Sequence, residues 1–115
     1  MNPKEEVIQF LKDFLFNIRT DRINDRNNKT LANLEFRSHH VKEILKQLKP
    51  EDYSEGPIPD KLYQMSDMWV FGKKIKAKEV YIKIQLGNPG CNVICISFHF
   101  AEHIINYPFK NKAYE

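Results

Sequence analysis

Three short runs between residues 69 and 99 alternate apolar with polar side chains, and they dominate the hydrophobic pattern of the chain. The runs span residues 69–73, 79–84 and 93–99, and β-branched and aromatic residues prevail in them. Such alternation is typical of half-buried β-strands, because successive strand side chains point to opposite faces of a sheet. We therefore predict three consecutive strands of one sheet that turns an apolar face toward the core.

The alternation also predicts the face on which each side chain lies. The core face is expected to carry Val80, Ile82, Ile84, Ile94, Ile96 and Phe98. The opposite face is expected to carry Tyr81, Lys83, Gln85, Val93, Cys95, Ser97 and His99. Because this second set includes a phenol, an ammonium group, a hydroxyl and an imidazole, we expect the chemistry of the protein on that face.

The first segment of the chain repeats its apolar residues with helical spacing. Asn2 and Pro3 suit the start of a helix, and the repeating positions are Val7, Ile8, Leu11, Phe14, Leu15 and Ile18. We predict a helix from residue 3 to about residue 14. Phe14, Phe16 and Ile18 also alternate, so the end of this segment fits a strand as well as a helix.

A second helix is predicted to begin at Ser38, with the core face Val41, Ile44, Leu45 and Leu48. Residues 19–29 are polar and are predicted to form a loop. Residues 51–67 contain glycine and prolines without sustained periodicity, and we predict a long loop of the kind that is usually functional or mobile. The segment after His103 either closes the sheet edge or frays.

The composition fits one domain over residues 1–115, since 42% of the residues are hydrophobic and 29% are charged. The formal net charge of +3 is compatible with an anionic partner but does not require one. The first residues resemble no signal peptide, and no apolar run approaches the roughly 20 residues that span a bilayer. We therefore expect a cytoplasmic protein without membrane contacts.

Cys91, Cys95, His99 and His103 recur every four residues, which on a helix suggests zinc. The intervening residues favour a strand, in which positions four apart are separated by about 13 Å. Zinc ligands lie about 2.0–2.3 Å from the metal, so one strand cannot bring these side chains to one ion. We predict no metal site and no cofactor, and the same spacing argues against a Cys91–Cys95 disulfide.

The first hairpin is rich in lysine, with Lys73, Lys74, Lys76, Lys78 and Lys83 within eleven residues. These lysines fit a patch that contacts the phosphates of a nucleic acid and, equally well, a solvated turn that protects a sheet edge. Trp69 is a candidate for stacking on an RNA base, although a lone tryptophan more often belongs to the core. His99 is a candidate for proton transfer near neutral pH, although a structural histidine is the more frequent case.

Several motifs, taken in order, resemble those of a known family. They are residues 51–57 (EDYSEGP), 68–73 (MWVFGK), 79–84 (EVYIKI) and 94–99 (ICISFH), followed by Ala101-Glu102 and Tyr107-Pro108-Phe109. In these segments, over about residues 30 to 110, the chain resembles the MqsR-like toxins of bacterial type II toxin–antitoxin systems. The resemblance implies an α+β fold, with helices packed on one antiparallel sheet, of the RelE-like bacterial ribonuclease type.

The resemblance also implies an endoribonuclease that cleaves mRNA and that a cognate antitoxin neutralises, typically a zinc-binding helix-turn-helix protein. Position by position, Tyr81 matches the family's tyrosine and Lys83 shares its motif. The family's late lysine follows Ser-Phe, and His99 occupies that place here. The family's early lysine falls at Glu55, and its glutamine near Val70.

Cleavage of RNA without a metal uses the 2′-hydroxyl as nucleophile and needs a base, an acid and cations for the phosphate. We expect His99 to act as general acid or base, Tyr81 to orient or protonate, and Lys83 with Lys73 to stabilise the phosphate charge. The replaced family residues favour an alternative, which is a catalytically inactive module on the same fold that binds RNA or the antitoxin.

Overall fold

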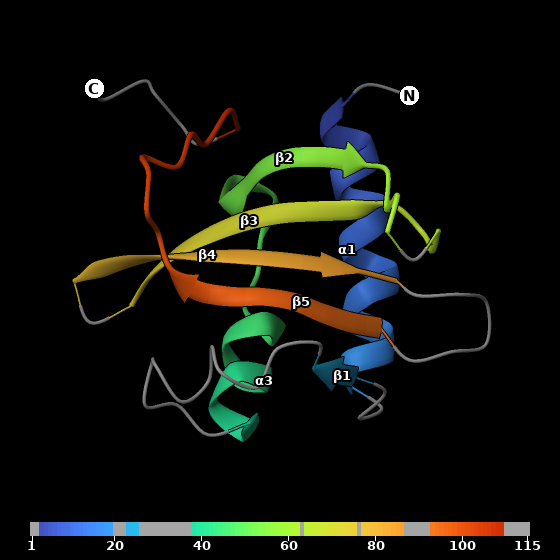
Figure 1. The fold of residues 1–115 in the computed structure, drawn as a ribbon, viewed down its shortest axis with the longest axis horizontal. Helices are drawn as coiled ribbons and strands as arrows, with labels where there is room; N and C mark the ends of the chain where they lie inside the picture. Colours follow the sequence, from blue (N-terminus) through green and yellow to red (C-terminus); the bar gives the residue numbers. More distant parts are fainter. Residues whose placement is uncertain are drawn as a thin grey trace.

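The computed structural model describes residues 3–19, 23–25, 38–62, 64–75, 77–86 and 93–109. A five-stranded sheet lies at the centre of this part of the chain, in the order β1-β5-β4-β3-β2 (Figure 1). Its strands are β1 (Ile23–Asp25), β2 (Tyr53–Ile58), β3 (Met68–Ile75), β4 (Lys78–Gln85) and β5 (Val93–Phe100). The three predicted strands are thus present as β3, β4 and β5, and the α+β class is confirmed.

Two elements of the sheet lie in segments that were predicted to be loops. The strands β2 to β5 pair antiparallel, as expected, but β1 pairs parallel with β5. The sheet is therefore mixed, although its antiparallel part is compatible with a RelE-like fold. The predictions of loops over residues 19–29 and 51–67 were wrong where β1 and β2 form.

Strand β2 forms an edge of the sheet, and a short 3₁₀ helix, η1 (Pro50–Asp52), leads into it. Its first residue, Tyr53, is buried against the core, whereas Glu55 is exposed and pairs with Val70 of β3. Pro57 lies within β2, and an edge strand tolerates proline because one side of its backbone forms no ladder. Gly56 and Pro57, which suggest a loop in the sequence, thus belong to an irregular edge strand.

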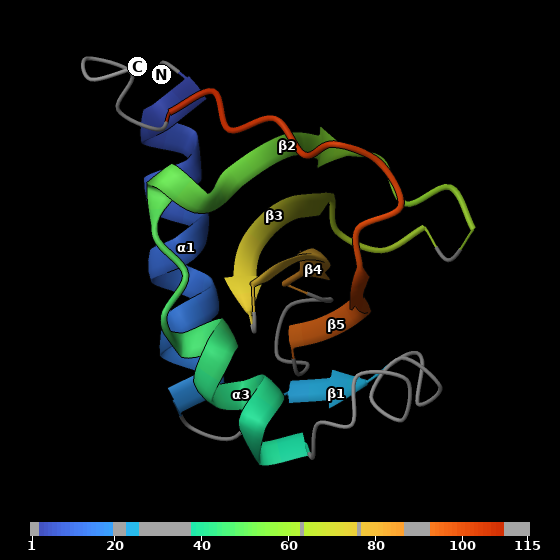
Figure 2. The same cartoon turned by 90° about the vertical axis from the view of Figure 1, so that its left-hand side faces the viewer.

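Two helices, α1 (Pro3–Arg19) and α3 (Ser38–Lys46), cover one face of the sheet (Figure 2). Helix α1 continues past the predicted end near residue 14. Phe14 and Ile18 are fully buried, whereas Phe16 is 67% exposed, and a strand would have placed all three on one face. The helical interpretation of this segment is therefore confirmed, and no helix in the described residues is long and apolar enough to cross a bilayer.

The core lies between these helices and the sheet. Aromatic rings form its centre, with the Phe10 and Trp69 ring centroids 4.8 Å apart and stacked. The buried apolar side chains that join the helices to the sheet are Val7, Phe10, Leu11, Phe14, Ile18, Val41, Leu45, Leu48, Tyr53, Trp69, Phe71, Val80, Ile82, Ile84, Val93, Cys95 and Phe98. The opposite side of the sheet, which we call the outer face, carries neither helix.

A β-bulge interrupts the alternation of β5. Ser97 pairs with Lys83, but Cys95 pairs with the next residue of β4, so Ile96 has no partner across the ladder. The side chains before and after the bulge that face the core are Val93, Cys95 and Phe98, whereas Ile94 and Ile96 are only half-buried. The predicted core positions Ile94 and Ile96, and the outer positions Val93 and Cys95, were therefore wrong, while Ser97 and His99 lie on the outer face as predicted.

Residues 101–109, which we call the crossing segment, pass from the end of β5 over the outer face toward β2 (Figures 1 and 2). Ala101 N donates to the Glu79 carbonyl oxygen at 2.9 Å, and the Tyr107 hydroxyl donates to Glu79 Oε2, also at 2.9 Å. Ile105 is buried, and the Phe109 ring stacks on Tyr53 with centroids 5.1 Å apart. Of the two predicted alternatives, closure of the sheet edge and fraying, the described residues fit the first in part, since the segment crosses the outer face and reaches the edge strand β2 at Tyr53.

Candidate active site on the outer face

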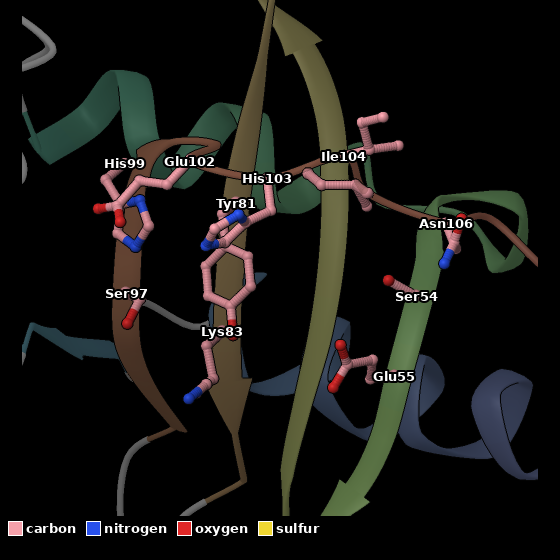
Figure 3. Close-up of a pocket in the computed structure, with 11 residues that line it drawn as sticks. Ser54, Glu55, Tyr81, Lys83, Ser97, His99, Glu102, His103, Ile104 and Asn106 are labelled. Carbon is pink, nitrogen blue, oxygen red and sulfur yellow. The ribbon is translucent and has the colours of Figure 1, made fainter.

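A cavity of about 470 Å³ lies on the outer face, between the sheet and the crossing segment (Figure 3). Strands β4 and β5 supply one side, β2 supplies the opposite side, and the crossing segment supplies the rim. The lining residues are Ser54, Glu55, Tyr81, Lys83, Ser97, His99, Glu102, His103, Ile104, Ile105 and Asn106. All three residues predicted to be catalytic, Tyr81, Lys83 and His99, are therefore brought together.

His99 is held in a defined orientation within the cavity. It pairs with Tyr81 across the β4–β5 ladder, and their rings stack with centroids 5.0 Å apart and an interplanar angle of 14°. His99 Nδ1 lies 2.8 Å from the Phe100 carbonyl oxygen. A carbonyl oxygen only accepts hydrogen bonds, so this contact assigns a proton to Nδ1. In the neutral ring, Nε2 then carries the lone pair and can accept a proton from a substrate.

Lys83 provides a positive charge beside this ring pair. It follows Tyr81 by two residues on the same face of β4, and its Nζ lies 5.9 Å from the centroid of the Tyr81 ring. Ser97 lies opposite Lys83 across the ladder. Strand alternation and the bulge in β5 thus place an ammonium group, a phenol, an imidazole and a hydroxyl on neighbouring positions of one surface.

Acidic and imidazole groups complete the cavity from the other two sides. Glu55 enters from β2, and Glu102 and His103 enter from the crossing segment, all three with exposed side chains. The family resemblance matches Glu55 to a functional lysine, but the sequence alone assigns none of the three residues a role in the site. For Glu102 and His103 the only signal is their position just beyond the third strand, which does not predict that the chain turns back over the sheet.

Gly72 explains how the crossing segment approaches the sheet so closely. Gly72 pairs with Tyr81 on the outer face of β3. A Cβ atom at this position would lie 2.9 Å from Tyr107 Cε1 and 3.0 Å from Ile105 Cδ1, and it would overlap the Tyr107 hydroxyl. Because Gly72, in the Trp-Val-Phe-Gly-Lys motif, has no side chain, Ile105 and Tyr107 of the crossing segment can pack directly on β3.

Of the four residues predicted to bind RNA, the three that the structure describes, Lys73, Lys74 and Trp69, do not line this cavity. Lys73 points to the helix side and forms an ion pair with Asp52, with Nζ and Oδ2 3.0 Å apart. Trp69 is only 9% exposed and packs on Phe10. Lys74 is exposed near the end of β3, and Lys76 lies outside the described residues.

Among the described candidates for the rejected zinc site, Cys95 lies on the other face of the sheet from His99 and His103. Cys95 is buried on the core face, with its Sγ 3.7 Å from the Ser97 carbonyl oxygen, whereas His99 lies on the outer face. Cys91 lies outside the described residues. Within the parts of the chain that the structure describes, no three His, Cys, Asp or Glu side chains are grouped as a metal site requires.

The fold and the cavity together define an α+β protein that presents imidazole, phenol and ammonium groups on the open face of its sheet. The family model described as "Motility quorum-sensing regulator, toxin of MqsA" matches residues 5–100. The chain therefore belongs to this MqsR toxin family, which confirms the resemblance and extends it toward the first helix. It is a toxin of a toxin–antitoxin system, and its family implies an antitoxin partner. Neither the curated proteins nor the solved structures contain a match.

Proposed function

We propose that this toxin is an endoribonuclease that cleaves mRNA without a metal ion and that its cognate antitoxin neutralises. The observation that supports this proposal is the cavity on the outer face, in which His99, Tyr81 and Lys83 meet. These three side chains match the chemical needs of RNA cleavage. An imidazole transfers protons near neutral pH, and an ammonium group stabilises charge on a phosphate.

In the proposed reaction the 2′-hydroxyl of the RNA attacks the adjacent phosphorus. His99 transfers a proton through Nε2, the ring nitrogen that the hydrogen bond to Phe100 leaves available. Lys83 stabilises the negative charge that accumulates on the phosphate oxygens. Tyr81 keeps the His99 ring in place by stacking and directs its own hydroxyl toward the same cavity.

RNA reaches this cavity along the outer face in our proposal. Lys74, exposed near the end of β3, is suited to contact a phosphate of the bound strand. Lys73 is less suited, because its ammonium group already binds Asp52 and the Gln47 carbonyl oxygen at 3.3 Å. The buried ring of Trp69 offers no free face for a base. The partner that controls the activity is proposed to be a zinc-binding helix-turn-helix antitoxin, as the family resemblance implies.

The proposal is tested with purified toxin, separated from its antitoxin and incubated with a defined mRNA in EDTA. Primer extension maps the cleavage sites for the wild-type protein and for His99→Ala. A positioned acid or base contributes about 10²–10⁴-fold to such a rate, so His99→Ala should lose most of the cleavage. His40→Ala, in the first turn of α3, is the matched control. Undiminished cleavage by His99→Ala would refute the assignment.

A second candidate function is a non-catalytic module that binds RNA or the antitoxin. The observation that favours it is Glu55, which lines the cavity where the family resemblance places a lysine. A carboxylate there repels a phosphate instead of attracting it. Growth on expression distinguishes the two candidates, because an active ribonuclease arrests growth and a binding module does not. RNA that is bound but left intact by the purified protein would favour the second candidate.

A further inference from the structure

A second imidazole, that of His103, lies in the same cavity and has no role in the reaction described so far. Figure 3 shows its ring directed into the space that His99 and Tyr81 also line. The backbone around it is fixed on both sides. Ala101 N is bonded to the Glu79 carbonyl oxygen, and Ile105 is buried over Gly72. The crossing segment thus holds His103 over the site while its side chain remains exposed.

The chemistry of RNA cleavage requires two proton transfers at separate places. The attacking 2′-oxygen and the departing 5′-oxygen lie roughly in line on opposite sides of the phosphorus. A single imidazole therefore cannot serve both oxygens in the same step. His99 Nδ1–H is engaged with the Phe100 carbonyl oxygen, so only Nε2 is available to the substrate. In the neutral ring Nε2 carries the lone pair and is ready to accept a proton. The group that supplies a proton to the leaving oxygen must come from another part of the cavity.

We propose that His103 is this group and acts as the general acid of the cleavage, an inference that rests on the proposed ribonuclease function. His99 Nε2 takes the proton of the 2′-hydroxyl, and the 2′-oxygen forms a bond to phosphorus. The bond between phosphorus and the 5′-oxygen breaks, its electron pair stays on that oxygen, and the His103 imidazolium donates the proton that completes the 5′-hydroxyl. The products are a 2′,3′-cyclic phosphate and a 5′-hydroxyl end.

The other polar groups of the cavity are less suited to this role. Lys83 and Tyr81 lie on β4, next to His99 on β5 and on the same face of the sheet, so they lie on the side of the proposed base. Glu55 and Glu102 supply carboxylates, which at neutral pH ordinarily carry no proton to donate. His103 supplies an imidazole, the side-chain type best suited to proton transfer near neutral pH, and it comes from a different element than His99.

The test uses a short oligoribonucleotide that contains one mapped cleavage site, prepared in two forms. One form has the natural 5′-oxygen at the scissile bond, and the other has a bridging 5′-sulfur. An alkoxide leaving group needs a proton, whereas a thiol ionises at a pKa of about 8.5 and leaves without one. Single-turnover rates are measured for wild type, His99→Gln, His103→Gln and the control His40→Gln. Dissociation constants for the uncleaved RNA are measured alongside.

We expect His103→Gln to lose about 10²–10⁴-fold on the oxygen substrate and to regain most of that loss on the sulfur substrate, with unchanged RNA affinity. His99→Gln should be slow on both substrates. Wild-type rates for His103→Gln on the oxygen substrate would overturn the inference and leave the proposed function intact. Equal losses on both substrates would overturn it as well. A wild-type protein that cleaves neither substrate would refute the proposed function itself.

Discussion

The contact between Gly72 and the crossing segment predicts that Gly72→Ala destabilises the protein through overlap with Tyr107 and Ile105. The substitution adds a methyl group on the outer face of β3. That methyl group would lie 2.9 Å from Tyr107 Cε1 and 3.0 Å from Ile105 Cδ1, closer than carbon atoms normally approach. Tyr107 must move, and its hydrogen bond to Glu79 then weakens or breaks.

The magnitude follows from two opposing effects. Forcing an extra methyl group into a packed site typically costs about 1–3 kcal/mol. Alanine in place of glycine in a strand interior stabilises the fold by about 0.5–1 kcal/mol, because alanine loses less conformational entropy than glycine on folding. We therefore expect Gly72→Ala to lower the free energy of unfolding by about 1 kcal/mol, which corresponds to about 4 °C in Tm for a chain of this size.

A double-mutant cycle separates the overlap from other effects of the alanine. Urea unfolding is measured for wild type, Gly72→Ala, Tyr107→Ala and the double variant. Tyr107→Ala removes the ring that the methyl group meets and leaves only the Ile105 contact, so Gly72→Ala should cost much less in that background. The expected coupling of about 1–2 kcal/mol exceeds the usual additivity error of about 0.3–0.5 kcal/mol. The same loss from Gly72→Ala in both backgrounds would refute the reasoning.

Two further predictions concern charged and ionisable groups. Lys73→Gln should lower the free energy of unfolding by about 1–2 kcal/mol, through loss of its ion pair and hydrogen bonds, without changing the cleavage rate. Lys74→Gln should leave the stability in urea unchanged but weaken RNA binding and make it less dependent on salt concentration. A loss of RNA affinity in Lys73→Gln but not in Lys74→Gln would contradict these two assignments. Burial, together with the hydrogen bond to Glu79, raises the pKa of Tyr107. The folded state therefore keeps this proton longer than the unfolded chain, and stability should be complete below about pH 10 and fall as the pH rises further. Tyr107→Phe should show a smaller alkaline loss of stability in urea titrations, and an identical loss would contradict the cause.

Much of the candidate site could be predicted from the sequence because it depends on local alternation. In β4, Val80, Ile82 and Ile84 face the core, so Tyr81 and Lys83 necessarily face the other way. Helix α3 could be predicted for a similar reason, since its apolar spacing is regular. Where one periodic pattern runs through an element, the pattern alone sets the face of each side chain.

The edges of the sheet could not be predicted in this way. Strand β1 has only three residues, too few to show a period, and its pairing with β5 is long-range. Strand β2 contains Gly56 and Pro57, which ordinarily indicate a turn, and its one buried residue is Tyr53. The crossing segment depends on the space over Gly72, a contact between residues far apart in sequence. The rim of the cavity, including His103, follows from these long-range contacts.

The bulge in β5 explains why the prediction failed for Ile94 and Ile96 and yet succeeded for His99. Cys95 and His99 are four residues apart, so a regular strand that buried Cys95 would bury His99 as well. The unpaired Ile96 adds one residue and reverses the alternation between them. One strand can therefore contribute Val93 and Cys95 to the core and still turn the imidazole of His99 outward onto the ring of Tyr81. The β-bulge at Ile96 is therefore the reason why the core positions of β5 could not be predicted from the sequence, and it also places His99, the proposed base, in the cavity.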